Sequence, residues 1–119
     1  MKNQDRSYIL FLEDIIVSMD RIQEYISNLD FASFKNSNIT VDAVIRNFEI
    51  IGEAVKNLPQ KLKSGRPEIP WDEMYRLRNR VSHGYFGINY EIIWDIAVNY
   101  IPGNRADIQK ILDEERAKL

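Results

Sequence analysis

Cysteine is absent from this chain of 119 residues, and histidine occurs once. Disulfide bonds and thiolate zinc sites are therefore excluded, because both need cysteine sulfur. No apolar run approaches the roughly 20 residues that a membrane-spanning helix requires. The polar start, Met1 to Arg6, lacks the apolar core and the small-residue cleavage site of a signal peptide. The sequence therefore predicts a cytoplasmic protein that makes no membrane contact.

Alternation of apolar and polar residues, which marks half-buried strands, is also nearly missing, so no β-sheet is expected. Apolar residues recur instead at helical spacing. Ser7 is expected to cap a first helix. The apolar seam of that helix consists of Tyr8, Leu12, Ile15, Met19, Ile22, Ile26 and Leu29. Such a continuous seam is typical of helices in antiparallel bundles.

A second long helix is expected between Thr40, as its N-cap, and Pro59, which would end it. Before it, Asp30 would cap a short helix at Phe31 to Lys35. Gly52 lies inside the long helix, where glycine is less favourable than alanine by roughly 1 kcal/mol. We therefore expect another helix to approach closely at Gly52.

Shorter helices are expected in the second half of the chain. A third helix would run from Trp71 through Val81, and Asn89 would cap a fourth. Pro102-Gly103 would interrupt the fourth helix and leave a last helix at residues 104–117. The predicted fold is an all-α, up-and-down bundle of four to five helices, in one domain over residues 1–119.

Positive charge gathers in the middle of a chain whose formal net charge is -2. Residues 56–80 hold seven Lys or Arg and three Asp or Glu, a local charge of 7 − 3 = +4. A local basic patch can bind phosphate even where the whole protein is acidic. The other interpretation of this charge is a solvated helix face followed by a charged loop.

The single histidine, His83, lies in a segment rich in side chains that bind phosphate, residues 76–86. Histidine exchanges a proton near neutral pH, and arginine matches phosphate oxygens with a permanent planar charge. Asn79 and Arg80, four and three positions before His83, would share a helix face with it. Arg78 lies five positions earlier, about 140° round an ideal helix. Arg78 and His83 would therefore converge only where the helix frays or where a second chain closes the site.

These residue types suit RNA cleavage without a metal ion. The 2′-hydroxyl attacks the adjacent phosphate, and the reaction needs a base, an acid and positive charge on the phosphorane. A homodimer would supply two histidines and at least two arginines around a two-fold axis. A two-metal site is disfavoured because the acids are scattered, and Glu49 and Glu53 have the spacing of an ordinary solvated pair. Taken alone, His83 has the alternative role of a hydrogen-bonded structural residue.

The same segment resembles the Arg-x4-His-x-Tyr signature of HepT-like toxins of the HEPN superfamily, at Arg78, His83 and Tyr85. This short motif by itself arises often by chance. The resemblance extends, in the same order, to the blocks Arg46 to Ala54, Ile69 to Trp71, His83 to Gly87, and Ile93 to Asp95. It covers roughly residues 8–115, and the ordered set of blocks is much more specific than the motif.

The resemblance implies a homodimeric helical bundle with paired motifs in one cleft. Arg78 and His83 would be catalytic, and Asn79 and Arg80 would support phosphate binding. The family implies a metal-independent endoribonuclease toxin that needs no cofactor and acts on mRNA or tRNA. Its partner would be a MntA-like minimal nucleotidyltransferase, the antitoxin of a type VII-like system, which transfers AMP to Tyr85. An adenylate there would occupy the phosphate site and add negative charge; the alternative role of Tyr85 is an aromatic anchor of its loop.

Two other functions stay open at this point. The family also includes non-catalytic substrate-binding subunits of nucleotidyltransferases, which is the main alternative. A helical dimer without a nucleic-acid role is the other, and the basic residues 56–80 disfavour it. The complete set of Arg78, Asn79, His83 and Tyr85 favours the ribonuclease.

Overall fold

The computed structural model describes residues 2–77, 79 and 87–119, with side chains from Tyr8 onward in the first helix. Within these ranges the chain forms helices, turns and loops and no strand, which confirms the predicted all-helical class. The helical elements are α1 (Lys2–Ile26), α2 (Phe31–Lys35), α3 (Asn38–Lys56), α4 (Gln60–Ser64), α5 (Trp71–Tyr75), α7 (Tyr90–Asp95), η1 (Ile96–Tyr100) and α8 (Ile101–Ala117). The number of helices in the bundle stays a prediction, because the expected third helix continues into residues outside the described ranges.

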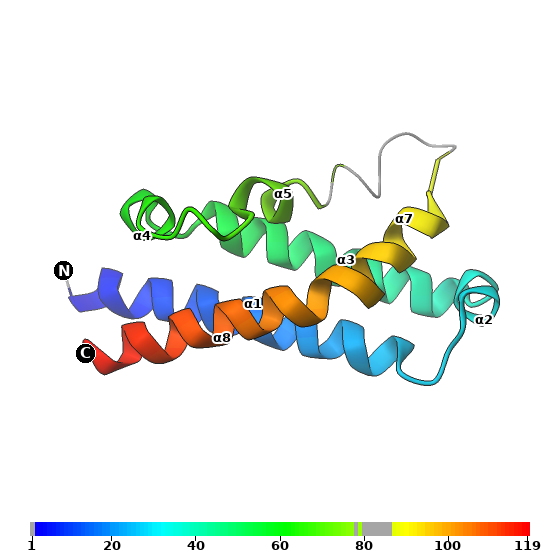
Figure 1. The fold of residues 1–119 in the computed structure, drawn as a ribbon, viewed down its shortest axis with the longest axis horizontal. Helices are drawn as coiled ribbons and strands as arrows, with labels where there is room; N and C mark the ends of the chain where they lie inside the picture. The colour runs from blue at the N-terminus through cyan, green and yellow to red at the C-terminus, as the bar shows by residue number, and fades with distance from the viewer. Residues whose placement is uncertain (1, 78, 80–86) are drawn as a thin grey trace.

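Helix α1 is the central element of the fold, since it packs along both α3 and α8. It runs opposite to both of these helices, and the N- and C-termini therefore lie at the same end of the molecule (Figure 1). Helix α5 packs against α3, on which it depends for its position. No helix among the described residues is long and apolar enough to cross a membrane.

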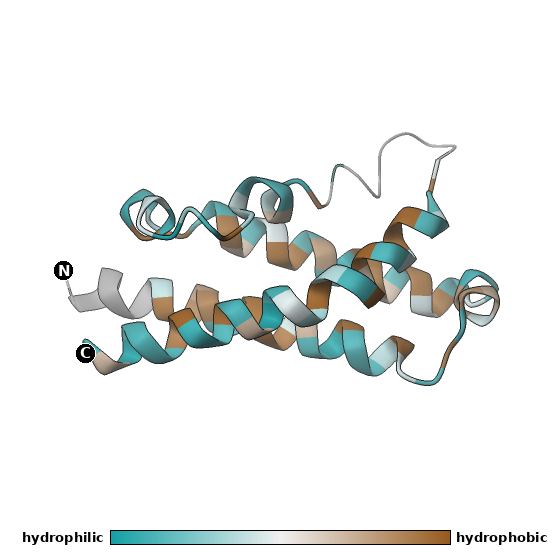
Figure 2. Ribbon diagram, viewed as in Figure 1, coloured by the Kyte–Doolittle hydropathy of each residue, from teal (hydrophilic) through white to brown (hydrophobic). Residues whose placement is uncertain are grey.

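A continuous apolar cluster fills the space between the helices. The seam predicted for α1 is confirmed from Leu12 to Ile26, with Leu12, Ile15, Met19 and Ile22 fully buried, whereas Leu29 lies beyond the end of the helix and is partly buried. Helices α3 and α8 add the fully buried Val44, Phe48, Ile51, Ile101 and Ile108. Hydrophobic and hydrophilic residues both occur along each long helix (Figure 2), as expected for helices that bury one face. Removing this apolar surface from water is the main favourable term in folding.

Side-chain caps fix where several helices begin. Asp30 accepts a hydrogen bond from the Ser33 amide at 2.8 Å, as predicted for the cap of α2. The expected cap at Thr40 is wrong, because Ser37 caps α3 and accepts from the Thr40 amide. Thr40 therefore lies within the first turn and donates its amide. The cap expected at Ser7 is also wrong, because α1 already begins at Lys2.

The two proline expectations have different outcomes. Helix α3 ends before Pro59, as expected, with Lys56 as its last residue, and Pro59 is the N-cap of α4. The break expected at Pro102-Gly103 does not occur, because α7 continues through η1, a single π-helical turn, into α8. Pro102 is the second residue of α8, which directly follows this π turn. The wider π turn before it provides the local adjustment that proline requires.

The close approach predicted at Gly52 is confirmed. A Cβ atom built on Gly52 would lie 2.8 Å from the carbonyl oxygen of Tyr75, which is closer than real Cβ contacts. Backbone therefore meets backbone where α3 crosses the end of α5. The absence of a side chain at Gly52 is what allows α5 to lie this close to α3.

A buried carboxylate ties the connector between α4 and α5 to the long helices. Glu115 on α8, 6% exposed, accepts hydrogen bonds from Tyr8 at 3.1 Å, from Lys118 at 2.7 Å and from Arg66 at 3.4 Å. Arg66 also pairs with Glu114 at 2.7 Å. Burial raises the pKa of Glu115, but the hydrogen bonds from Lys118, Tyr8 and Arg66 lower it more, so the pKa lies below its usual 4.5.

Substituting Gly52→Ala is expected to destabilise the protein by about 1–3 kcal/mol, because the added methyl group meets backbone that cannot move away freely. Gly103→Ala is the matched control. A Cβ there meets no atom within 4 Å, so alanine should stabilise α8 by about 0.5–1 kcal/mol. Urea unfolding followed by circular dichroism measures both changes. A Gly52→Ala protein as stable as the Gly103→Ala protein would contradict the close approach.

Glu115→Gln is expected to destabilise the protein at neutral pH by about 1–3 kcal/mol, because charged hydrogen bonds are replaced by neutral ones. The folded-state pKa of Glu115 is lowered, so its contribution is complete above the unfolded pKa and is lost as pH falls through the folded value. The difference in unfolding free energy between wild type and variant should therefore shrink below pH 4.5. Glu114→Gln should have a smaller effect, because the Glu114 side chain is 43% exposed. A difference that is constant from pH 7 to pH 3 would contradict this role.

Candidate functional site

The residues that the sequence singles out fall at one place in the chain, after α5. Arg78, Arg80, His83 and Tyr85 lie outside the described residues. Asn79 is described, has helical backbone and is exposed. It lines a small pocket of about 80 Å³ with Glu49, Gly52, Glu53, Lys56 and Tyr75. The structure thus brings Asn79 against α3, next to the close approach at Gly52.

Helix α5 has one buried face and one face that is at least partly exposed. Met74 is buried in the core and anchors the helix. Trp71 and Tyr75, four residues apart, share the other face, as helical spacing requires. The Trp71 indole N–H donates to the Arg66 carbonyl at 3.0 Å, which fixes the ring, whereas Tyr75 is 45% exposed. Two aromatic side chains therefore project from the same face of α5, and that of Trp71 is fixed by its hydrogen bond.

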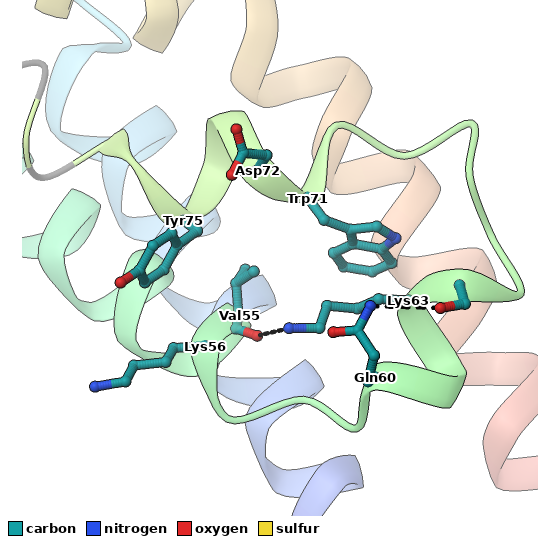
Figure 3. Close-up of a pocket in the computed structure, with 8 residues that line it drawn as sticks. Val55, Lys56, Gln60, Lys63, Trp71, Asp72 and Tyr75 are labelled. Carbon is teal, nitrogen blue, oxygen red and sulfur yellow. Dashed lines mark hydrogen bonds between the residues drawn. The ribbon is translucent and has the colours of Figure 1, made fainter.

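A larger pocket of about 320 Å³ adjoins the first. It is lined by Val55, Lys56, Gln60, Lys63, Ser64, Trp71, Asp72 and Tyr75. Figure 3 shows the rings of Trp71 and Tyr75 projecting from α5 toward the side formed by α4 and the end of α3. The two pockets share Lys56 and Tyr75, and we call their combined surface the α3–α5 groove. It extends from Asn79 at one end to Lys63 and Trp71 at the other.

Lysines give the larger pocket of this groove its positive charge. Lys63 donates to the Val55 carbonyl at 3.2 Å, which places its ammonium at the C-terminal end of α3 (Figure 3). The ion pairs found among the described residues do not include Lys56 or Lys63. Asp72, the one acid lining the larger pocket, is paired with Arg76 at 3.2 Å. The larger pocket therefore presents cations beside aromatic rings.

Carboxylates occupy the other part of the groove. Glu49 and Glu53, interpreted from the sequence as an ordinary solvated pair, line the smaller pocket beside Asn79. Glu49 lies 3.7 Å from Arg46 in an exposed ion pair. Within the described ranges, no three His, Asp or Glu side chains are grouped as ligands for a metal ion. Of the two pockets, the one lined by Lys56 and Lys63 is therefore the more favourable for a phosphate.

In the sequence, Lys56 and Lys63 belong to a basic segment and Trp71 to a family block, but the pattern did not indicate that the three line one pocket. The spacing of Trp71 and Tyr75 was the available signal, because residues four apart share a helix face. It could not show which surface that face adjoins. That depends on where α5 lies on α3, which is a tertiary property.

Comparison with known proteins gives a consistent result. A sequence model of the family described as "Ribonuclease HepT-like" matches residues 15–111. "Probable ribonuclease HepT" of Thermococcus cleftensis is 40% identical over 106 residues, 89% of this chain and 96% of that protein. A "Putative RNase" of Methanocaldococcus jannaschii is 45% identical over 104 residues, 87% of this chain and 86% of that protein. No solved structure matches this chain.

A further relative shows the same sequence region inside a longer protein. It is the M. jannaschii "Gamma-glutamylcyclotransferase and putative RNase", 36% identical over 105 residues. The match covers 88% of this chain but 47% of that relative.

Among the described residues, the fold is all-helical and the groove presents lysines and aromatic rings beside Asn79. With a family match over most of its length, the chain belongs to the HepT-like ribonuclease family.

Proposed function

We propose that this protein is an endoribonuclease toxin that cleaves RNA without a metal ion. One observation carries the proposal: the family match over residues 15–111 includes the complete motif from Arg78 to Tyr85. The position of Asn79 supports it, because this motif residue borders a groove with lysines and aromatic rings. An RNA substrate, mRNA or tRNA, would be met in the cytoplasm.

The chemistry assigns a role to each motif residue. The 2′-oxygen of the RNA forms a bond to the adjacent phosphorus while the bond from phosphorus to the 5′-oxygen breaks. His83 takes the proton from the 2′-hydroxyl or gives one to the leaving 5′-oxygen. Arg78 stabilises the charge of the phosphorane, and Asn79 and Arg80 bind the phosphate. The products are a 2′,3′-cyclic phosphate and a 5′-hydroxyl end.

A homodimer would complete this machinery. The reaction uses a base and an acid, and each chain carries a single histidine. Two chains related by a two-fold axis would bring both histidines and two copies of Arg78 to one cleft. The matching 47% of a longer relative further supports residues 1–119 as one helical domain that can be joined to other enzymes.

Regulation is proposed to act on Tyr85. A MntA-like nucleotidyltransferase, the antitoxin of a type VII-like system, would catalyse attack of the Tyr85 hydroxyl oxygen on the α-phosphorus of ATP. The bond to the β-phosphate breaks, pyrophosphate leaves, and the hydroxyl proton passes to solvent. The adenylate then occupies the phosphate site with bulk and negative charge. The alternative, a non-catalytic substrate-binding subunit of the nucleotidyltransferase, predicts partner binding without RNA cleavage.

His83→Ala and Arg78→Ala are each expected to reduce RNA cleavage at least about 100-fold, because proton transfer or phosphorane stabilisation is lost. The wild type should cleave in EDTA and leave 2′,3′-cyclic phosphate ends, seen by mass spectrometry of the fragments. As controls, both variants should keep the wild-type unfolding temperature and a light-scattering mass of twice the 14.0 kDa chain. An activity that EDTA removes and magnesium restores contradicts the mechanism, and an inactive wild type that still binds the nucleotidyltransferase supports the alternative.

Tyr85→Phe is expected to stay toxic and to escape silencing by the nucleotidyltransferase, because it keeps the ring and loses the acceptor oxygen. On co-expression, wild type should gain the mass of one or more adenylates and the variant none. Growth inhibition with and without the partner gives the functional readout. Loss of toxicity in the variant would assign the hydroxyl to cleavage. Full silencing of the variant would show that the partner inhibits by binding alone.

A further inference from the structure

The α3–α5 groove combines the two features by which proteins hold single-stranded nucleic acid. Such proteins pair cationic side chains, which bind the backbone, with aromatic rings, on which bases stack. Here Lys56 and Lys63 supply the cations, and Trp71 and Tyr75 supply the rings. The pocket of about 320 Å³ is in the lower range of small-molecule sites and matches one nucleotide better than a helix of a partner protein.

We propose that the α3–α5 groove holds one nucleotide of a single-stranded RNA beside the cleavage site, with its base on Trp71 and Tyr75 and its phosphate on Lys56 and Lys63. The proposal rests on the proposed ribonuclease function, whose motif begins at the Asn79 end of the groove. It adds a binding subsite made of residues that lie outside that motif.

Each side chain is suited to its part. The Trp71 ring is held by its hydrogen bond to the Arg66 carbonyl, so it offers a fixed face. Tyr75 is 45% exposed and lines both pockets. The Lys63 ammonium has three donors and uses one on the Val55 carbonyl, which leaves two for phosphate oxygens. Lys56 is exposed at the junction of the two pockets, where the strand would pass toward Asn79.

The charges in the groove indicate at which end the phosphate of the bound nucleotide lies. Glu49 and Glu53 line the pocket at the Asn79 end, and carboxylates repel phosphate. The phosphate of the nucleotide held in the groove therefore lies at the end formed by Lys56 and Lys63. A single strand is required, because bases paired in a duplex are not free to stack on protein rings.

The test uses the full chain with His83→Ala, which blocks cleavage, and a short labelled single-stranded RNA of mixed sequence. In this background Tyr75→Ala should weaken binding about five-fold or more, as loss of one stacked base does. Tyr75→Phe should restore it, and Tyr25→Ala, an exposed tyrosine on α1, should have no effect. A strand of the same length that lacks bases should bind with equal affinity to the Tyr75→Ala protein and to the protein that keeps Tyr75. Fluorescence anisotropy measures each affinity.

Lysine variants give an independent readout through salt dependence. Lys56→Gln should lower the slope of log Kd against log salt by about 0.7, the value for one lost phosphate contact on a single strand. Tyr75→Ala should leave that slope unchanged. Lys61→Gln is the matched control, because Lys61 is an exposed lysine of the same basic segment that does not line the groove. It should change affinity and slope less than Lys56→Gln does.

The outcomes separate this proposal from the function on which it rests. Unchanged RNA binding in Tyr75→Ala and Lys56→Gln, together with RNA cleavage by the His83-containing chain, overturns the subsite and leaves the ribonuclease intact. Equal losses of RNA affinity in Lys56→Gln and Lys61→Gln would show that general positive charge binds the RNA, and this result also overturns the subsite. If the variants bind RNA normally but no longer bind the nucleotidyltransferase, the groove is a binding surface for that partner protein, and the subsite is overturned. A chain that neither binds nor cleaves RNA overturns both proposals.

Discussion

The contact between Gly52 on α3 and the Tyr75 carbonyl on α5 sets the geometry on which the rest of the site depends. Two helix backbones can approach this closely only where one of them has no side chain. At this crossing, the exposed face of α5 adjoins the end of α3, and Tyr75 and Lys56 come to line the same pockets. Asn79, which follows α5 in the chain, lines one of these pockets beside Gly52. One glycine thus links the packing of the core to the form of the groove.

The remaining helices hold this crossing in place. Helix α3 is fixed by its long contact with α1, whose buried seam is continuous with the core. The connector before α5 is held from the other side, because Arg66 pairs with Glu114 and Glu115 on α8. The Arg66 carbonyl in turn orients the Trp71 ring. The groove is therefore supported by helices that do not line it, as a rigid binding surface requires.

Local signals predicted some of the helix caps correctly and missed others. Asp30 caps α2 as predicted, because its carboxylate accepts a hydrogen bond from the Ser33 amide. Thr40 failed as a cap because Ser37, three residues earlier, has the same chemistry and captures the Thr40 amide. The break predicted at Pro102 does not occur, because a π turn accommodates the proline and the burial of Ile101 and Ile108 favours continuing the helix. Spacing alone cannot rank such competing solutions.

The sequence by itself determined the all-helical class, the buried seam of α1, the need for a close neighbour at Gly52 and the residue types of the motif. These follow from periodicity, steric size and side-chain chemistry, which are properties of short segments. Only the tertiary structure decided that the neighbour is the end of α5, and that Lys56 and Lys63 meet Trp71 and Tyr75 in one groove. That outcome depends on how the helices pack, because residues far from the groove fix the position of α5 on α3.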